Sequence, residues 1–212
     1  MNTHAFIAVL TGDLVNSGTL GPDKIVRAFR ALAACAERQV GWMGAPLRFT
    51  RHRGDGWQAV LTHPQKALRS ALSFRAALRA EGEEFDSYIA IAEGNAPERL
   101  LADLNVHTED VFVRSGQGLD DLKKMRRPLR MAHAGQGPVD AAVILADHLS
   151  QGWTPAQAQA ILPMLDPTFT GTQSDIARRL NKSRQAVAKA LQAAGWETLE
   201  HALATLEKGP SR

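Results

Sequence analysis

Two acidic residues stand at the ends of short apolar segments, where a carboxylate can do chemistry. Asp13 lies in TGDLVNSG, directly after an apolar run, and Asp55 lies in RGDGWQAVL, at the start of another. Two neighbouring carboxylates can hold Mg²⁺, whose remaining ligands are water and the phosphates of a substrate. If the two acids meet in the fold, the pair predicts a site for Mg²⁺ and a phosphate-bearing ligand.

The glycines beside these acids fit the same hypothesis, but a purely structural explanation stays open. Gly12 and Gly54 would let phosphate oxygens approach the backbone, so both are candidates for nucleotide binding. Alternatively, Asp13 begins a turn and Asp55 fills a position in a hairpin turn, which are common places for aspartate. The spacing of the two acids does not decide between these explanations.

Segments of regular periodicity surround the two acids. Short apolar or alternating runs predict strands, and apolar residues at helical spacing predict helices. In chain order, the expected elements are a strand at 5–10, a helix at 21–43, a hairpin at 47–53 and 56–62, a helix at 67–82 and a strand at 86–94. This β-α-β-β-α-β order predicts an α+β, ferredoxin-like domain whose two helices cover one face of a mostly antiparallel sheet. The first strand and the hairpin should then end side by side.

The segment that follows is less regular. VFVRS, residues 111–115, is a candidate extra strand, residues 116–127 have a helical pattern, and residues 128–135 fit an edge strand. The glycine-rich GQGP is the best candidate for a domain boundary. We therefore expect a sheet domain over residues 1–136 and an all-helical domain over residues 137–212.

TQSDIARRLNKSRQAVAKALQAAGW, in the helical domain, has the pattern of a helix-turn-helix. Thr172 or Gln173 opens the first helix, Asn181 suits the left-handed turn, and Ser183 is the expected N-cap of the second helix. The side chains expected to face inward are Ile176, Ala177, Leu180, Ala186, Val187, Ala190 and Leu191. The pattern also suits an ordinary helical hairpin that serves packing or dimerisation.

The charge of this segment favours DNA as its partner. Residues 173–192 carry five basic side chains against one acidic side chain, and such a focus of charge can neutralise phosphates. The exposed start of the second helix is where such motifs contact base edges in the major groove. The candidate DNA-binding residues are Arg178, Arg179, Lys182, Ser183, Arg184, Gln185 and Lys189.

Composition sets wider limits. The chain has 212 residues and a formal net charge of +3, so its overall charge is weak evidence for a polyanionic partner. The single cysteine, Cys35, cannot form an intramolecular disulfide and lies in an apolar helical pattern typical of a core. No run is long and apolar enough for a membrane span, and the start lacks a signal-peptide pattern, so we expect a cytoplasmic protein.

Two sequence motifs resemble those of a known enzyme class. TGDLVNS and RHRGDGWQAVL, whose aspartates lie 42 positions apart, resemble the two metal-aspartate motifs of class III nucleotidyl cyclases, while IAIAEG and GQGLDDLKKM resemble later parts of those domains. With a helix-turn-helix added, the layout resembles the SatD family of small bacterial proteins. The resemblance implies a nucleoside triphosphate bound through Mg²⁺, with Asp13, Asp55 and the backbone of Leu14 at the metal.

The sequence departs from the cyclase pattern at two positions of the late helix. Cyclases carry an asparagine and an arginine on the late helix, and aligning the glycines on Gly116 puts Asp120 and Lys124 at those positions. A negative charge there has the wrong sign for stabilising phosphoryl transfer. The leading hypothesis is therefore a DNA-binding transcriptional regulator whose sheet domain senses Mg²⁺ and a nucleotide. A Mg²⁺-dependent, cyclase-like enzyme is the alternative. We also expect a homodimer, because cyclase-type domains usually pair and a single helix-turn-helix reads too few bases to be selective.

Overall fold

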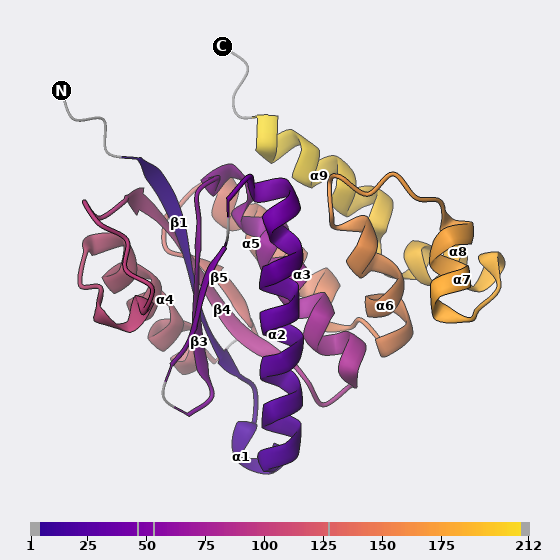
Figure 1. Ribbon diagram of the computed structural model, residues 1–212, viewed down its shortest axis with the longest axis horizontal. Coiled ribbons are helices and arrows are strands. Elements are labelled where there is room, and N and C mark those ends of the chain that lie inside the picture. The colour runs from indigo at the N-terminus through magenta and orange to yellow at the C-terminus, as the bar shows by residue number, and fades with distance from the viewer. Residues whose placement is uncertain (1–4, 46, 53, 127, 209–212) are drawn as a thin grey trace.

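A five-stranded mixed sheet forms the centre of the protein (Figure 1). The computed structural model describes residues 5–208 except 46, 53 and 127. The strand order is β2-β3-β1-β4-β5, in which the first four strands pair antiparallel and β5 runs parallel to β4. The strands are β1 (Phe6–Leu14), β2 (Arg48–Arg51), β3 (Gly56–Leu61), β4 (Ser87–Asn95) and β5 (Met131–His133). The chain is thus of the α+β class that the sequence predicts, with the expected edge strand.

Helices cover both faces of this sheet. On one face, α2 (Pro22–Met43) and α3 (Ala67–Glu81) bury the side chains of Leu10 and Leu14 from β1. On the other face, α4 (Asp110–Lys124) covers Ile7 and Val9, because successive side chains of a strand point to opposite faces. The shorter connecting helices are α1 (Ser17–Leu20), η1 (Pro64–Lys66) and η2 (Leu104–Val106).

The extra strand expected at residues 111–115 is wrong, because this segment is the first part of α4. Val111, Phe112 and Ser115 are buried, while Val113 is 43% exposed. This spacing puts the buried side chains on one helical stripe, which continues through Leu119 and Leu122. The alternation in VFV is too short to distinguish a strand from the start of such a helix.

The C-terminal helices pack directly on the sheet region. They are α5 (Pro138–Gln151), α6 (Pro155–Met164), α7 (Gln173–Leu180), α8 (Arg184–Ala193) and α9 (Trp196–Lys208). In Figure 1, α6 lies beside α3, and α7 and α8 form the end of the molecule farthest from α4. One continuous cluster of buried apolar side chains runs from Ala8 in β1 to Leu203 in α9. The division at residue 136 stays a prediction.

A buried group of charged side chains ties α3, β4 and α5 together. Arg75 is fully buried, and its guanidinium contacts Asp86 at 3.2 Å and Asp147 at 2.7 Å. The same guanidinium donates to Ser150 Oγ at 2.7 Å, and Arg130 pairs with Asp86. Buried charges are costly unless they are paired, and here each buried carboxylate pairs with at least one guanidinium group. The network therefore joins α5 to the sheet region through Arg75, and the backbone amide of Arg130 donates a further hydrogen bond to Asp147 at 2.9 Å.

Gly12 has a packing role that the sequence pattern does not reveal. A Cβ placed on Gly12 would lie 2.2 Å from the indole ring of Trp57, whose side chain is fully buried. The indole N–H of Trp57 donates to Ser87 Oγ at 3.0 Å, and that hydroxyl lies 3.0 Å from the carbonyl oxygen of Asp13. The missing side chain at position 12 thus lets Trp57 support the end of β1.

We expect the Gly12→Ala substitution to destabilise the protein by about 1–3 kcal/mol, because the indole must move out of a close-packed core. Gly116→Ala is the matched control, since a Cβ there meets open space on α4 and alanine favours a helix. Urea unfolding followed by circular dichroism measures both changes. Equal stability of the Gly12 and Gly116 variants would contradict this role of Gly12.

Candidate functional site

The sheet brings Asp13 and Asp55 together at the same end of the neighbouring strands β1 and β3. Asp13, the residue before the last one of β1, pairs with Gly56 of β3, and Asp55 lies in the turn directly before β3. The amide of Leu14 donates to the carbonyl oxygen of Asp55 at 3.2 Å, which joins the two segments beyond the last paired residues. The expected meeting of the first strand and the hairpin is therefore confirmed.

Two other side chains hold these carboxylates. The hydroxyl of Ser17 donates to Asp55 Oδ2, and the ammonium of Lys123, near the end of α4, donates to Asp13 Oδ2. Asn16, with φ 52° and ψ 35°, adopts the left-handed conformation just before Ser17. Asparagine tolerates that conformation better than most residues. The Asn16-Ser17 pair of the TGDLVNSG motif is therefore suited to place the Ser17 hydroxyl against Asp55.

The electrostatics are those of two coupled carboxylates beside one cation. Burial raises the pKa of Asp13, and the neighbouring carboxylate of Asp55 raises it further against the opposing hydrogen bond from Lys123. Burial also acts to raise the pKa of Asp55, but hydrogen bonds from Ser17 and Asp13 outweigh it and hold that pKa below its usual range. Hydrogen bonding to Asp13 raises the pKa of Lys123. When both carboxylates are ionised they repel each other, and a bound cation relieves that repulsion.

The geometry suits an ion that needs few protein ligands. Within residues 5–208, apart from the three that are not described, no group of three or more His, Cys, Asp or Glu side chains could hold a metal ion. Mg²⁺ commonly takes one or two carboxylates and completes its shell with water and phosphates. Asp13 and Asp55 fit that requirement, and the ammonium of Lys123 already marks the position as one that attracts positive charge. The role of the Leu14 backbone stays a prediction.

The predicted nucleotide-binding residues are Gly12, Gly54, Asp120 and Lys124, but the lysine that contacts the carboxylate pair is Lys123. Lys123 contacts Asp13, whereas the sequence alignment selects its neighbour Lys124, which is exposed on α4. Asp120 lies one helical turn before Lys123, and its charge adds to the rise in the pKa of that lysine. Adjacent residues of a helix point about 100° apart, so the rotation of α4 about its axis decides whether Lys123 or Lys124 reaches β1.

The glycines of the two motifs differ in their surroundings. Gly54, with φ +76°, adopts a conformation that favours glycine, and a Cβ there would meet open space. Gly12, by contrast, is required by Trp57 on the core side of β1. Contact of either backbone with a nucleotide stays a prediction.

The second candidate site is the pair of short helices α7 and α8. Thr172 caps α7 in a reciprocal capping box with Asp175, and Ser183 caps α8 by accepting from the amide of Ala186 at 3.1 Å. Asn181 ends α7 in the left-handed conformation, with φ 51° and ψ 48°. These three local predictions are confirmed, because they depend on residues close together in the chain.

The helix pair buries one side and exposes the other. Ile176, Ala177, Val187 and Leu191 are buried, and Leu180 and Ala190 pack partly against them. Ala186 is exposed, so the expectation that it faces inward is wrong; the buried stripe of α8 passes through Val187 instead. All seven candidate DNA-binding residues are exposed, namely Arg178, Arg179, Lys182, Ser183, Arg184, Gln185 and Lys189.

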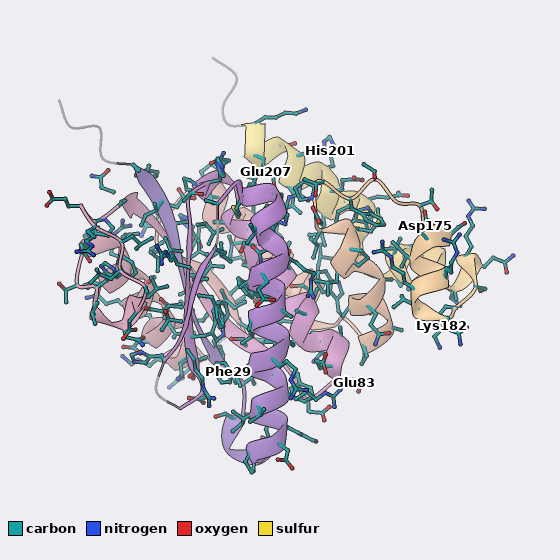
Figure 2. All side chains as sticks on the ribbon, viewed as in Figure 1. Phe29, Glu83, Asp175, Lys182, His201 and Glu207 are labelled. Carbon is teal, nitrogen blue, oxygen red and sulfur yellow. The ribbon has the colours of Figure 1, made fainter. Side chains whose placement is uncertain are left out.

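Two of these arginines already have neighbours. Arg178 forms an ion pair with Asp175 at 3.1 Å, and the guanidinium of Arg179 lies 5.7 Å from the ring centre of Phe169. In Figure 2, Asp175 and Lys182 lie at the outer end of the molecule, away from the sheet. The surface is thus accessible at one end of the protein.

Comparison with known proteins gives little that bears on these sites. No family model and no curated protein matches the chain, so the resemblance to the SatD family stays a prediction. One similar solved structure is the active GGEEF domain of a diguanylate cyclase from Vibrio cholerae, at 20% identity and a TM-score of 0.45. That match covers 62% of this chain and 85% of the other, an overlap too loose to transfer function. In the described part of the chain, no helix is long and apolar enough to cross a membrane.

Proposed function

We propose that residues 1–136 form a ferredoxin-like, nucleotidyl cyclase-like domain that binds a nucleoside triphosphate through a divalent cation. The observation that carries this proposal is the meeting of Asp13 and Asp55 at one end of strands β1 and β3. Both side chains are only partly buried, so an ion and a phosphate can approach them. A lone turn aspartate would need neither the second carboxylate nor the lysine that faces it.

Each residue of the site has a distinct part in this proposal. Asp13 and Asp55 hold the cation, and Ser17 fixes the orientation of Asp55 by its hydrogen bond. Bound Mg²⁺ supplies charge neutralisation to the two carboxylates and to the phosphates. Lys123 transfers its hydrogen bond from Asp13 to a phosphate oxygen when the cation neutralises Asp13, because an ammonium binds phosphate as a point charge.

Binding, rather than cyclisation, is the proposed function of this site. Asp120 stands on the same helix as Lys123 and contributes negative charge to its surroundings. Cyclisation requires positive or hydrogen-bonding groups where negative charge develops on the transferred phosphoryl group. A carboxylate next to the triphosphate opposes that stabilisation. A cyclic or oligomeric nucleotide product is therefore the alternative that the same assay must detect.

Calorimetric titration of the full chain with ATP, GTP, CTP and UTP tests this proposal, with Mg²⁺, with Mn²⁺ and without a divalent cation. We expect one nucleotide per chain, binding only with the cation, and a loss of at least about tenfold in affinity for Asp55→Ala, which corresponds to about 1.4 kcal/mol. Chromatography of the same mixtures detects any product.

The matched control is Asp140→Ala, on α5, which removes one aspartate away from the carboxylate pair. It should bind the nucleotide as the wild type does. The proposal is wrong if all four nucleotides fail to bind, or if affinity is the same with and without the cation.

We further propose that α7 and α8 bind DNA, with α8 in the major groove. The observation that favours this second function is the αL turn at Asn181 between two capped helices, together with an exposed face that carries Lys182, Arg184 and Lys189. Arg184 and Gln185 stand at the exposed start of α8, where base edges are reached. Two copies of the chain would be required to read a selective site, so the expected homodimer belongs to this proposal.

Replacing Arg184 and Lys189 together with alanine should weaken DNA binding by about tenfold or more and should flatten its salt dependence by about one unit of slope per lost phosphate contact. Fluorescence anisotropy with random-sequence duplexes at several salt concentrations measures both quantities. Lys208→Ala, at the end of α9, is the control, because it removes one positive charge outside the helix pair. The proposal is wrong if the double variant binds DNA as tightly as the wild type and its affinity does not depend on salt.

A further inference from the structure

A cavity of ≈ 290 Å³ lies between α2 and the C-terminal helices. Its walls are mainly apolar and include Trp42 from α2, Leu162 from α6 and Phe169 from the loop before α7. Ile176 of α7 closes another side. Such a volume lies near the lower end of the range of small-molecule sites in proteins. The carboxylate pair does not belong to this cavity, so it forms a separate candidate site.

One buried amide in the cavity wall has a weak partner. Gln39 is 2% exposed, and its amide oxygen accepts from Ser70 Oγ at 2.5 Å. Its amide nitrogen donates to Cys35 Sγ at 3.4 Å, and a thiol sulfur is a poor acceptor. Burial raises the pKa of the Cys35 thiol to about 11, so this part of the wall is uncharged at neutral pH. The amide nitrogen can therefore donate to an oxygen atom of a ligand.

The charged residues of the cavity favour a ligand with a single negative charge. Arg38 and Arg179 both line the cavity and are exposed, and Arg38 forms no ion pair within the described residues. Asp166 is the acid that lines the same cavity, and one of its oxygens accepts from the amide and hydroxyl of Thr168 at 2.8 and 2.6 Å. Two guanidinium groups against one carboxylate leave a net charge of +1, which suits a carboxylate better than a dianion.

We propose that this cavity binds a small amphiphilic carboxylate, with its apolar body between Trp42, Leu162 and Phe169 and its carboxylate at Arg38. The ligand would contact α2, which lies on the sheet, and α7, which belongs to the exposed helix pair. Because it touches both regions, its binding stabilises their packing and raises the melting temperature. The site is independent of the carboxylate pair and of its nucleotide.

Calorimetric titration of the full chain with sodium decanoate, below its micelle concentration, tests the proposal. We expect one decanoate per chain and an affinity about tenfold lower for Arg38→Gln. Arg30→Gln is the matched control, because Arg30 is exposed on the same helix, outside the cavity lining. It should bind decanoate as the wild type does. Decanol, which lacks the charge, should bind the wild type and Arg38→Gln equally.

A second variant tests the cavity itself. Leu162→Trp adds volume inside the walls and should abolish decanoate binding while circular dichroism shows an unchanged helix content. If that variant fails to fold, the comparison between Arg38→Gln and Arg30→Gln still decides the outcome. Absence of binding, several decanoates per chain, or equal affinity in wild type and Arg38→Gln would overturn the proposal.

Discussion

Replacing Arg75 with leucine should lower the free energy of unfolding by about 3–5 kcal/mol, a loss that removes a large share of the stability of a typical domain. The reason is the position of Arg75 between two buried acids. Without its guanidinium, Asp147 and Asp86, at 0% and 2% side-chain exposure, lose a charged partner while staying out of water. Urea unfolding followed by circular dichroism measures the change.

The matched control for Arg75 is an exposed ion pair. Lys24 contacts Glu84 at 2.8 Å, but the two side chains are 50% and 42% exposed, so water competes with the pair. Lys24→Leu should therefore cost no more than about 1 kcal/mol. Should Arg75→Leu cost as little as Lys24→Leu, the buried network would have no special part in holding α5 on the sheet.

Replacing Lys123 with alanine should change the affinity for the cation and for the nucleotide in opposite directions. Lys123 competes with a metal ion for Asp13, so its loss should strengthen binding of Mn²⁺ alone by about five- to tenfold. Binding of the nucleotide with Mn²⁺ should weaken by about tenfold, because a charge-assisted hydrogen bond to phosphate is lost. Two calorimetric titrations of the same variant, one with Mn²⁺ and one with Mn²⁺ and GTP, separate these effects.

Lys24→Ala removes the same charge away from Asp13 and should leave both titrations unchanged. If Lys123→Ala weakens binding of Mn²⁺ alone, the lysine does not compete with the ion. If it leaves nucleotide binding unchanged, Lys123 is not the phosphate ligand.

Local patterns and strand order predicted much of the fold from the sequence. The strand that carries Asp13 and the hairpin whose turn carries Asp55 follow from short apolar runs, and their meeting follows from the order of the elements. Asn181 and Ser183 have the predicted conformation and cap, because both depend on neighbours within a few residues. These features are local or follow from strand order, so a single sequence reveals them.

Other features depend on contacts between distant residues, which no local pattern contains. Arg75 stands within an apolar helical pattern, and its partner Asp147 lies 72 positions away. Lys123 meets Asp13 across 110 positions, and only the rotation of α4 distinguishes it from Lys124. The fit of Trp57 against Gly12 likewise depends on packing between β1 and β3. Each of these residues has an ordinary local sequence, so its role becomes visible only in three dimensions.

The most direct test of the carboxylate pair is electron paramagnetic resonance of Mn²⁺ titrated into the full chain. Free Mn²⁺ gives a sharp six-line signal that binding broadens, so the bound fraction is measured without a nucleotide. We expect one bound Mn²⁺ per wild-type chain, loss of binding in Asp13→Asn and in Asp55→Asn, and unchanged binding in Asp140→Asn. Equal binding in all four proteins, or none in the wild type, would contradict a cation site between Asp13 and Asp55.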